Sequence, residues 1–202
     1  MSIINHAEKV IHFKIVYYGP GVAGKTANLQ YIYRCLPDTN KGNIISLATG
    51  DDRTIFFDFL PVSALKVRGF ETRFQLYTVP GQVHYNMTRR LVLRGADGVV
   101  FVADSQFERL RENVESLRNL EENLREYGQT LQELPYVIQY NKRDLPNVAP
   151  VEYLEYVLNG KGRRVPYFEA VAMEGKGVFD TLNTVSRMVL ANEFGDGHKG
   201  AP

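Results

Sequence analysis

Residues 19–26 read Gly-Pro-Gly-Val-Ala-Gly-Lys-Thr and match the phosphate-binding pattern G-x-x-x-x-G-K-[ST]. The β-branched and aromatic run at 13–18 predicts a buried strand before it, and residues 27–35 predict a helix after it. A glycine-rich turn in this position lets backbone N–H groups surround a phosphate, and the helix N-terminus adds positive potential. The segment therefore predicts an α/β fold with a phosphate-binding loop, in which Lys25 contacts the outer phosphates and the Thr26 hydroxyl binds Mg²⁺.

The rest of the chain alternates between strand and helix patterns. Strands are predicted at 54–60, 72–79, 98–103, 135–140 and 167–171, and helices at 110–124, 151–158 and 178–189. This alternation favours a doubly wound sheet with right-handed crossovers. The strands at 54–60, expected to end at Pro61, and at 72–79 have no helix between them, so they predict an antiparallel hairpin at one edge.

A second polar motif, Asn141-Lys142-Arg143-Asp144, follows the strand at 135–140 at its carboxyl end, where α/β sheets bind ligands. The Asp144 carboxylate can accept hydrogen bonds from the N1–H and the exocyclic amine of guanine. Adenine offers no such pair of donors and would leave a buried carboxylate unpaired. The Lys142 stem can lie against the base, and Asn141 can either bond the base or brace the phosphate loop. The motif therefore favours guanine over adenine nucleotides.

Both motifs belong to a longer series of segments that resembles the Ras-like small GTPases and, more closely, the bacterial MglA family of polarity and gliding-motility GTPases. The resembling segments include 14–21 (KIVYYGPG), 76–82 (LYTVPGQ), 93–105 (LRGADGVVFVADS), 137–147 (VIQYNKRDLPN) and 169–172 (EAVA). The resemblance implies a Ras-like P-loop NTPase domain over 1–194, followed by a flexible tail at 195–202. It implies a mostly parallel six-stranded sheet with one antiparallel edge strand and helices on both faces.

The resemblance also implies a function. Members of the MglA family are cytoplasmic GTPases that bind Mg²⁺, and a homodimeric Roadblock-fold activator, MglB, switches them off. A chain of this family would be a GDP/GTP switch for cell polarity and motility that hydrolyses GTP slowly unless activated. Its partners would be an MglB-type activator and polarity or motility effectors.

Roles for individual residues follow from the same resemblance. The nucleotide-binding set is Gly19, Gly21, Val22, Ala23, Gly24, Lys25, Thr26, Ala27, Thr54, Gly81, Asn141, Lys142, Asp144 and Ala172. Thr54 corresponds to the first-switch threonine that binds Mg²⁺ beside Thr26, with Thr49 as a rival in the same loop. Lys25 is also placed in the catalytic set. Gln82 would orient the attacking water, and Arg53 is either an arginine finger supplied from within the chain or an exposed edge-strand arginine.

Three positions depart from the pattern of Ras-like proteins. Thr78 stands where most carry the Asp that holds Mg²⁺ through a water, a replacement that the MglA family shares. Met173 stands where many carry a lysine, while the Ala172 N–H could still reach guanine O6. Gly50 stands where close relatives tend to carry an acidic residue. Thr78 and Gly50 leave the affinity for Mg²⁺ open, and Gly50 should also make the first switch more mobile.

The composition bears on the compartment, on metal binding and on binding to membranes or nucleic acid. The single cysteine, Cys35, fits a reducing cytosol, and the 4 histidines show no metal-ligand spacing. No apolar run approaches the roughly 18 residues that span a bilayer. Ser2 excludes myristoylation and the end carries no prenylation cysteine, so no direct membrane anchor is expected. The net charge of +1 comes with no basic arm, which argues against nucleic acid. We expect a cytoplasmic monomer that partners concentrate at a cell pole.

Four functions stay open on the sequence alone. The first is a slow GTP-hydrolysing switch, and the second is a GTP-binding scaffold with little or no turnover. Arg53 and Gln82 favour the switch, whereas Thr78 and Gly50 favour the scaffold. The third is a P-loop ATPase or small-molecule kinase, which Asp144 disfavours. The fourth is a structural protein of a motility machine with a passive nucleotide.

Overall fold

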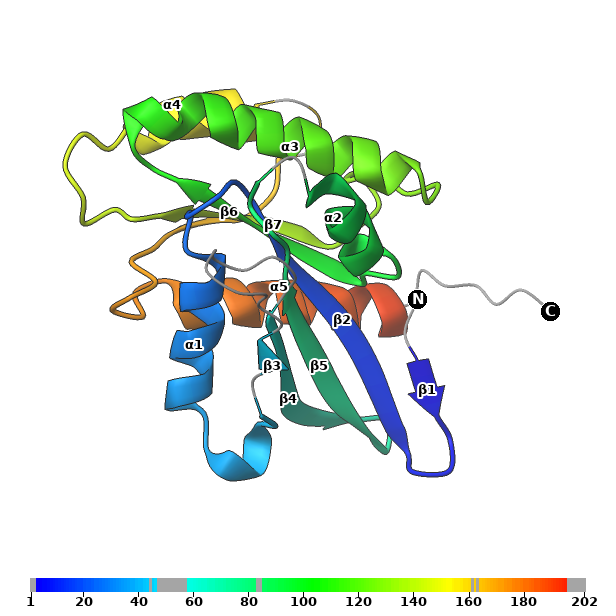
Figure 1. Cartoon of the computed structure of the whole chain (residues 1–202). Coiled ribbons are helices and arrows are strands. Elements are labelled where there is room, and N and C mark those ends of the chain that lie inside the picture. The colour runs from blue at the N-terminus through cyan, green and yellow to red at the C-terminus, as the bar shows by residue number, and fades with distance from the viewer. Residues whose placement is uncertain are drawn as a thin grey trace.

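A central sheet with helices on both faces organises the molecule (Figure 1). The computed structural model describes residues 3–43, 45–46, 58–82, 85–160, 162 and 164–195. In that part of the chain eight strands join in the order β3-β4-β5-β2-β6-β7-β8, with β1 beside β2. The strands are β1 (Ile3–Asn5), β2 (Val10–Tyr18), β3 (Ile45–Ser46), β4 (Asp58–Val67), β5 (Phe70–Thr78), β6 (Gly98–Asp104), β7 (Tyr136–Asn141) and β8 (Tyr167–Glu169). The helices are α1 (Lys25–Cys35), α2 (Asn86–Leu93), α3 (Leu110–Arg125), α4 (Val151–Leu154) and α5 (Val178–Phe194).

The predicted α/β class is confirmed, and the six expected strands are all present as β4, β5, β2, β6, β7 and β8. The β2–β5, β2–β6, β6–β7 and β7–β8 pairs are parallel, and β4 pairs antiparallel with β5. Two short strands, β1 and β3, were not predicted and add two antiparallel pairs. They are only three and two residues long, so they carry too little hydrophobic alternation to be seen in sequence.

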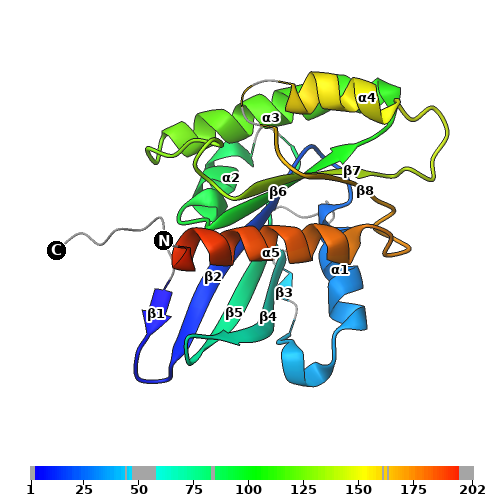
Figure 2. The same ribbon diagram turned by 180° about the vertical axis from the view of Figure 1, so that it is seen from behind.

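Side chains of β2 point alternately to the two faces of the sheet and contribute to a hydrophobic core on each face. Phe13, Ile15 and Tyr17 pack with α1 and α5 on one face, whereas Val16 and Tyr18 pack with α2, α3 and α4 on the other. Figure 2 shows α1 and α5 together on the first face, and Figure 1 shows α3 and α4 across the second. All seven residues of β6 are buried, as expected for a central parallel strand that is covered on both faces.

The strand expected to end at Pro61 continues to Val67. Residues 54–57 of that prediction lie outside the described residues. Pro61 pairs with Gln75 of β5, while the β3–β4 pairing reaches only to Phe59 on the other side. Proline lacks a backbone donor, so a strand tolerates it where one side has no ladder partner. The prediction that Pro61 stops the strand is therefore wrong, because the position of Pro61 relative to β3 depends on the tertiary structure.

The predicted antiparallel hairpin is confirmed, and its turn is Arg68-Gly69. Both residues have a positive φ, 50° for Arg68 and 84° for Gly69, which is typical of the two-residue turns that match strand twist. The Arg68 guanidinium donates to the Phe194 carbonyl at 3.1 Å and lies over the Phe194 ring. The hairpin tip is thereby tied to the end of α5.

Helix α3 buries a polar stripe that the apolar spacing did not predict. Leu124 is fully buried, but Leu110, Val114 and Leu117 are only partly buried. The most buried positions of α3 include Asn113, Ser116, Asn119 and Asn123. They are satisfied internally: the Tyr18 hydroxyl donates to Asn119 at 2.7 Å, and Asn123 donates to Tyr18 at 2.9 Å. Hydrogen bonding lets these side chains be buried without a large desolvation cost.

Helix α5 ends at Phe194. Of the flexible tail expected at 195–202, residues 196–202 lie outside the described residues. None of the described helices combines the length and the apolar character needed to cross a bilayer.

Close packing of α5 on β6 depends on Gly98. A Cβ there would lie 2.7 Å from Val189 Cγ2 and 3.1 Å from Val185 Cγ2. Both valines are buried and stiff about χ1, so Gly98→Ala should lower the free energy of unfolding by about 1–3 kcal/mol, as overpacking does. Urea denaturation measures this effect. Val189→Ala combined with Gly98→Ala should cost less than the sum of the single changes, and strict additivity would contradict the contact.

Candidate functional site

One cavity of about 670 Å³ lies where the loops that follow β2, β5, β7 and β8 meet. These strands are parallel, so their carboxyl ends share an edge of the sheet, the usual ligand site of such folds. The cavity is lined by Gly21, Val22, Gly24, Lys25, Thr26, Ala27, Val79, Pro80, Gly81, Gln82, Tyr85, Asn141, Lys142, Asp144, Leu145, Val171, Ala172 and Met173. Its volume falls in the range of small-molecule and cofactor sites, roughly 300–1,000 Å³.

The loop after β2 has the backbone that its glycines predict. Gly19 has φ 144°, and a Cβ there would lie 2.1 Å from the Val102 carbonyl oxygen of β6. Gly24 has φ 101° and is the N-cap of α1. Val22 also has a positive φ of 62°, and it is largely exposed. This conformation presents successive amides and the start of α1 to the cavity, an arrangement that suits phosphate.

Lys25 is held inside the loop. Its Nζ donates to the Pro20 carbonyl at 2.6 Å and to the Gly19 carbonyl at 3.1 Å. The residue is only 6 % exposed, yet it lines the cavity. The ammonium group is therefore buried next to the predicted phosphate position, where low solvent access strengthens its attraction for anions.

Asn141 connects three loops. Its Nδ2 donates to the Ala23 carbonyl at 2.7 Å, and its Oδ1 accepts the Ala172 N–H at 2.9 Å. Gly24 is necessary for this approach, since a Cβ there would lie 2.2 Å from Asn141 Nδ2. Of the two roles left open for Asn141, the structure shows the bracing one. The Ala172 N–H already serves Asn141, so an additional contact to guanine O6 would have to share this donor.

Lys142 and Asp144 both line the cavity. Lys142 has φ 66°, an uncommon backbone for a residue with a side chain, and its Nζ donates to Asp104 Oδ2 at 2.6 Å. Asp144 is exposed and lines the cavity. None of the described residues gives its carboxylate a hydrogen bond, so both oxygens can accept bonds from a ligand.

The segment after β5 closes the phosphate side. Gly81 packs directly on the phosphate-binding loop, since a Cβ there would lie 2.2 Å from Gly21 Cα. Gln82 is exposed and lines the cavity, and the Tyr85 N–H donates to its carbonyl at 3.2 Å. Glycine at 81 is thus a steric requirement of this approach, whereas a Cβ at Gly21 would lie no closer than 3.9 Å to Gly81.

Helix α2 anchors this segment through Arg89, which is fully buried. Its Nη2 donates to Ser116 Oγ at 2.8 Å, and the guanidinium lies 4.4 Å from the centre of the Tyr18 ring. Burial lowers the pKa of Arg89, partly offset by its interaction with Tyr18. The anchor positions the helix that follows Gln82 and Tyr85.

Comparison with known proteins identifies the family. The chain matches the Ras family over residues 14–191. The chain belongs to the Ras family of small GTPases.

Individual relatives agree with this assignment. Mutual gliding-motility protein MglA of Myxococcus xanthus (strain DK1622) is 59 % identical over 190 residues, covering 94 % of this chain and 96 % of that protein. The Ypt/Rab-type GTPase ypt71 of Schizosaccharomyces pombe (strain 972 / ATCC 24843) is 28 % identical, covering 93 % of this chain and 86 % of that protein. Ras-related protein Rab7 of Prunus armeniaca is also 28 % identical, covering 89 % and 83 %.

The donor set of this Ras-family chain fits an Mg²⁺ that binds together with a nucleotide. Among the described residues, no group of three His, Cys, Asp or Glu side chains could hold a metal. Thr26 lines the cavity, and Mg²⁺ commonly takes one or two protein ligands and completes its shell with phosphate oxygens and water. Thr78 is fully buried at the end of β5 and brings no charge to the site.

Most of the site residues expected from the sequence meet in the cavity. Gly19 and Ala23 do not line it but support the loop from within the fold. Arg53 and Thr54, and the rival Thr49, lie outside the described residues. Tyr85 and Leu145 were missed, although each follows a predicted site residue closely in sequence.

We expect Asn141→Ala to loosen all three loops at once. The change leaves the Ala23 carbonyl and the Ala172 N–H without this partner, and each unmade buried hydrogen bond costs roughly 1–3 kcal/mol. The free energy of unfolding should fall by about 2–5 kcal/mol, and the GDP dissociation constant should rise at least ~10-fold. Chemical denaturation and equilibrium titration measure both quantities. Asn183→Ala, at an exposed position of α5, is the matched control. Unaltered GDP affinity in Asn141→Ala would refute the bracing role.

Proposed function

We propose that this chain is a GDP/GTP switch that hydrolyses GTP slowly unless activated and regulates gliding motility and cell polarity. The observation that carries the proposal is one cavity lined by both the phosphate-binding loop and Asp144. The biological setting rests on the 59 % identity to a mutual gliding-motility protein over almost the whole of both chains.

Guanine would be selected by Asp144. Its exposed carboxylate can accept the N1–H and the exocyclic amine together, and adenine cannot offer that pair. Lys142, whose ammonium is held by Asp104, would lay its stem along one face of the base. Met173 is 76 % exposed and lines the cavity, and its apolar side chain would stand where many GTPases carry a lysine.

The phosphates would be bound by the amides of 21–26 and by Lys25, and Thr26 would hold the Mg²⁺ together with Thr54. When bound, the metal would neutralise charge on the phosphate oxygens. Gln82 would orient the water that attacks the terminal phosphate. Arg53 would place a guanidinium against the charge that develops on the transferred phosphoryl group.

Regulation by partners is part of the proposal. An MglB-type Roadblock-fold homodimer would stimulate hydrolysis, and effectors of polarity or motility would bind the GTP form. Such partners would concentrate the protein at a cell pole.

A second candidate is a guanine-nucleotide-dependent scaffold with little turnover. The observation that favours it is Thr78, which is buried and uncharged where Ras-like proteins carry the Asp that supports Mg²⁺. Phosphate release over multiple turnovers, with and without the activator, separates the two functions.

Base selectivity gives the sharpest test of the binding site. We expect Asp144→Asn to weaken GDP binding by ~100-fold or more, because a site built to bond a donor pair loses its match. The same variant should gain affinity for xanthosine diphosphate, whose position 2 is an acceptor for the new amide. Competition titrations measure the ratio of the affinities for GDP and xanthosine diphosphate in the wild type and in the variant. Asp180→Asn, in the first turn of α5, serves as control. GDP affinity equal to that of the wild type would remove Asp144 from the site.

Hydrolysis is tested separately from binding. Gln82→Leu and Arg53→Ala should each reduce activator-stimulated phosphate release by ~100-fold or more, because each removes a group that acts in the transition state. GDP affinity should stay within about twofold of the wild type. Gln30→Leu, at an exposed position of α1, is the matched control for the glutamine change. Full stimulation of either variant would disprove the catalytic role of that residue.

A further inference from the structure

Asp104 is a buried carboxylate that the proposed chemistry does not use. It ends β6, and its side chain is fully buried. Asn113 of α3 holds its backbone from both sides, accepting the Asp104 N–H at 3.0 Å and donating to its carbonyl at 2.8 Å. Oδ1 of Asp104 accepts the Gln106 N–H at 3.1 Å. The carboxylate is therefore fixed in place before any ligand binds.

Two cations from different elements face the other oxygen of Asp104. Lys142 Nζ lies 2.6 Å from Oδ2, and Arg109 Nε lies 4.0 Å from the same atom. Lys142 belongs to the loop proposed to contact the base, and its left-handed backbone needs a stabilising contact. The Asp104 carboxylate supplies that contact at the tip of the lysine.

Arg109 continues the connection to the phosphate side. Its Nη2 donates to the Gly21 carbonyl at 3.0 Å, and its Nη1 donates to Glu112 at 2.8 Å. Gly21 lines the cavity and lies against Gly81. A single chain of contacts thus runs from Lys142 through Asp104 and Arg109 to the phosphate-binding loop.

We propose that Asp104 and Arg109 are positioning residues that lock the base loop to the phosphate loop and thereby set how long a guanine nucleotide stays bound. The inference rests on the proposed nucleotide site and goes beyond it, because neither residue lines the cavity. When both loops are already ordered, nucleotide binding costs less conformational entropy. Affinity differences among variants of one site lie mostly in the dissociation rate, so we expect the lock to slow nucleotide release. Neutralising Asp104 would free Lys142 and also weaken the hold on Arg109.

The test measures GDP release from the full chain, using a fluorescent GDP analogue chased with excess GDP. Asp104→Asn keeps the shape of the side chain and removes the charge, and Arg109→Ala removes the bond to Gly21. Each should speed release roughly 10- to 100-fold, the effect of one lost charge-assisted hydrogen bond, with a smaller change in the association rate. The double variant should release GDP more slowly than the product of the two single effects predicts, because both act on one network.

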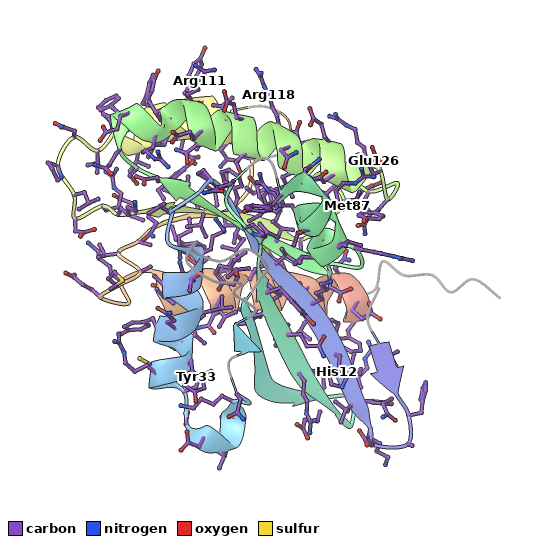
Figure 3. The ribbon with its side chains drawn as sticks, viewed as in Figure 1. His12, Tyr33, Met87, Arg111, Arg118 and Glu126 are labelled. Carbon is purple, nitrogen blue, oxygen red and sulfur yellow. The ribbon has the colours of Figure 1, made fainter. Side chains whose placement is uncertain are left out.

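Arg109→Lys and Arg109→Gln separate a positioning role from a merely structural one. Both retain an N–H donor for the Gly21 carbonyl, but only lysine retains the charge, so Arg109→Lys should restore slow release more fully. They also keep the proposal testable if Asp104→Asn does not fold. Arg111→Ala is the matched control, since Arg111 points away from the sheet on the outer side of α3 and pairs with Glu115 at 2.8 Å (Figure 3).

The outcomes distinguish this inference from the proposed function. If the wild type retains GDP and the folded variants release it within twofold of the wild-type rate, the positioning role is overturned while the nucleotide site stands. A fall in thermal stability with unchanged release would likewise overturn it, because that result describes support of the fold alone. If the wild type does not bind GDP, the site and the inference both fall.

Discussion

The whole ligand-binding edge of this protein depends on Asn141. Its side chain bonds the Ala23 carbonyl and the Ala172 N–H, so it fixes the phosphate-binding loop relative to the two loops expected to contact a base. The bonds are buried, and buried amide groups without partners are costly. Gly24 makes the approach possible by lacking a Cβ. The phosphate-binding loop and the two loops proposed to contact the base are consequently held together by one side chain.

Polar contacts also hold α2 and α3 together on the second face of the sheet. Asn113, Asn119 and Asn123 of α3 would be exposed in an ordinary amphipathic helix, yet here they bond Asp104, Tyr18 and Asn86. Apolar packing gives that interface its area, while the hydrogen bonds allow few alternative arrangements. Arg89 adds a buried charge to the same interface from α2. The buried polar side chains of α3 therefore contact α2, the helix that follows Gln82, and also the end of β6 that carries Asp104.

This arrangement suits a switch protein of the Ras family. The nucleotide edge is held by buried bonds, whereas Gln82, Met87 and Leu91 are exposed around α2, where a partner could reach them. Asp104 and Arg109 would add a second connection between the base and phosphate sides that does not use the Asn141 side chain. With a braced pocket beside an accessible helix, nucleotide binding and partner binding would use different parts of the surface.

The sequence by itself determined the fold class, and it predicts the phosphate-binding loop and the preference for guanine. The two site predictions depend on short segments, 19–26 and 141–144, that lie directly after predicted strands. The fold class depends on the alternation of strand and helix patterns along the chain. Only the tertiary structure decided that Pro61 continues a strand, that α3 buries asparagines, and that Asp104 faces both Lys142 and Arg109. Each of these features depends on groups that are far apart in the chain. A strand tolerates a proline only where the neighbouring strand leaves one side unpaired, and a polar side chain is buried only where another element supplies a hydrogen-bond partner. Local sequence patterns do not identify these neighbours.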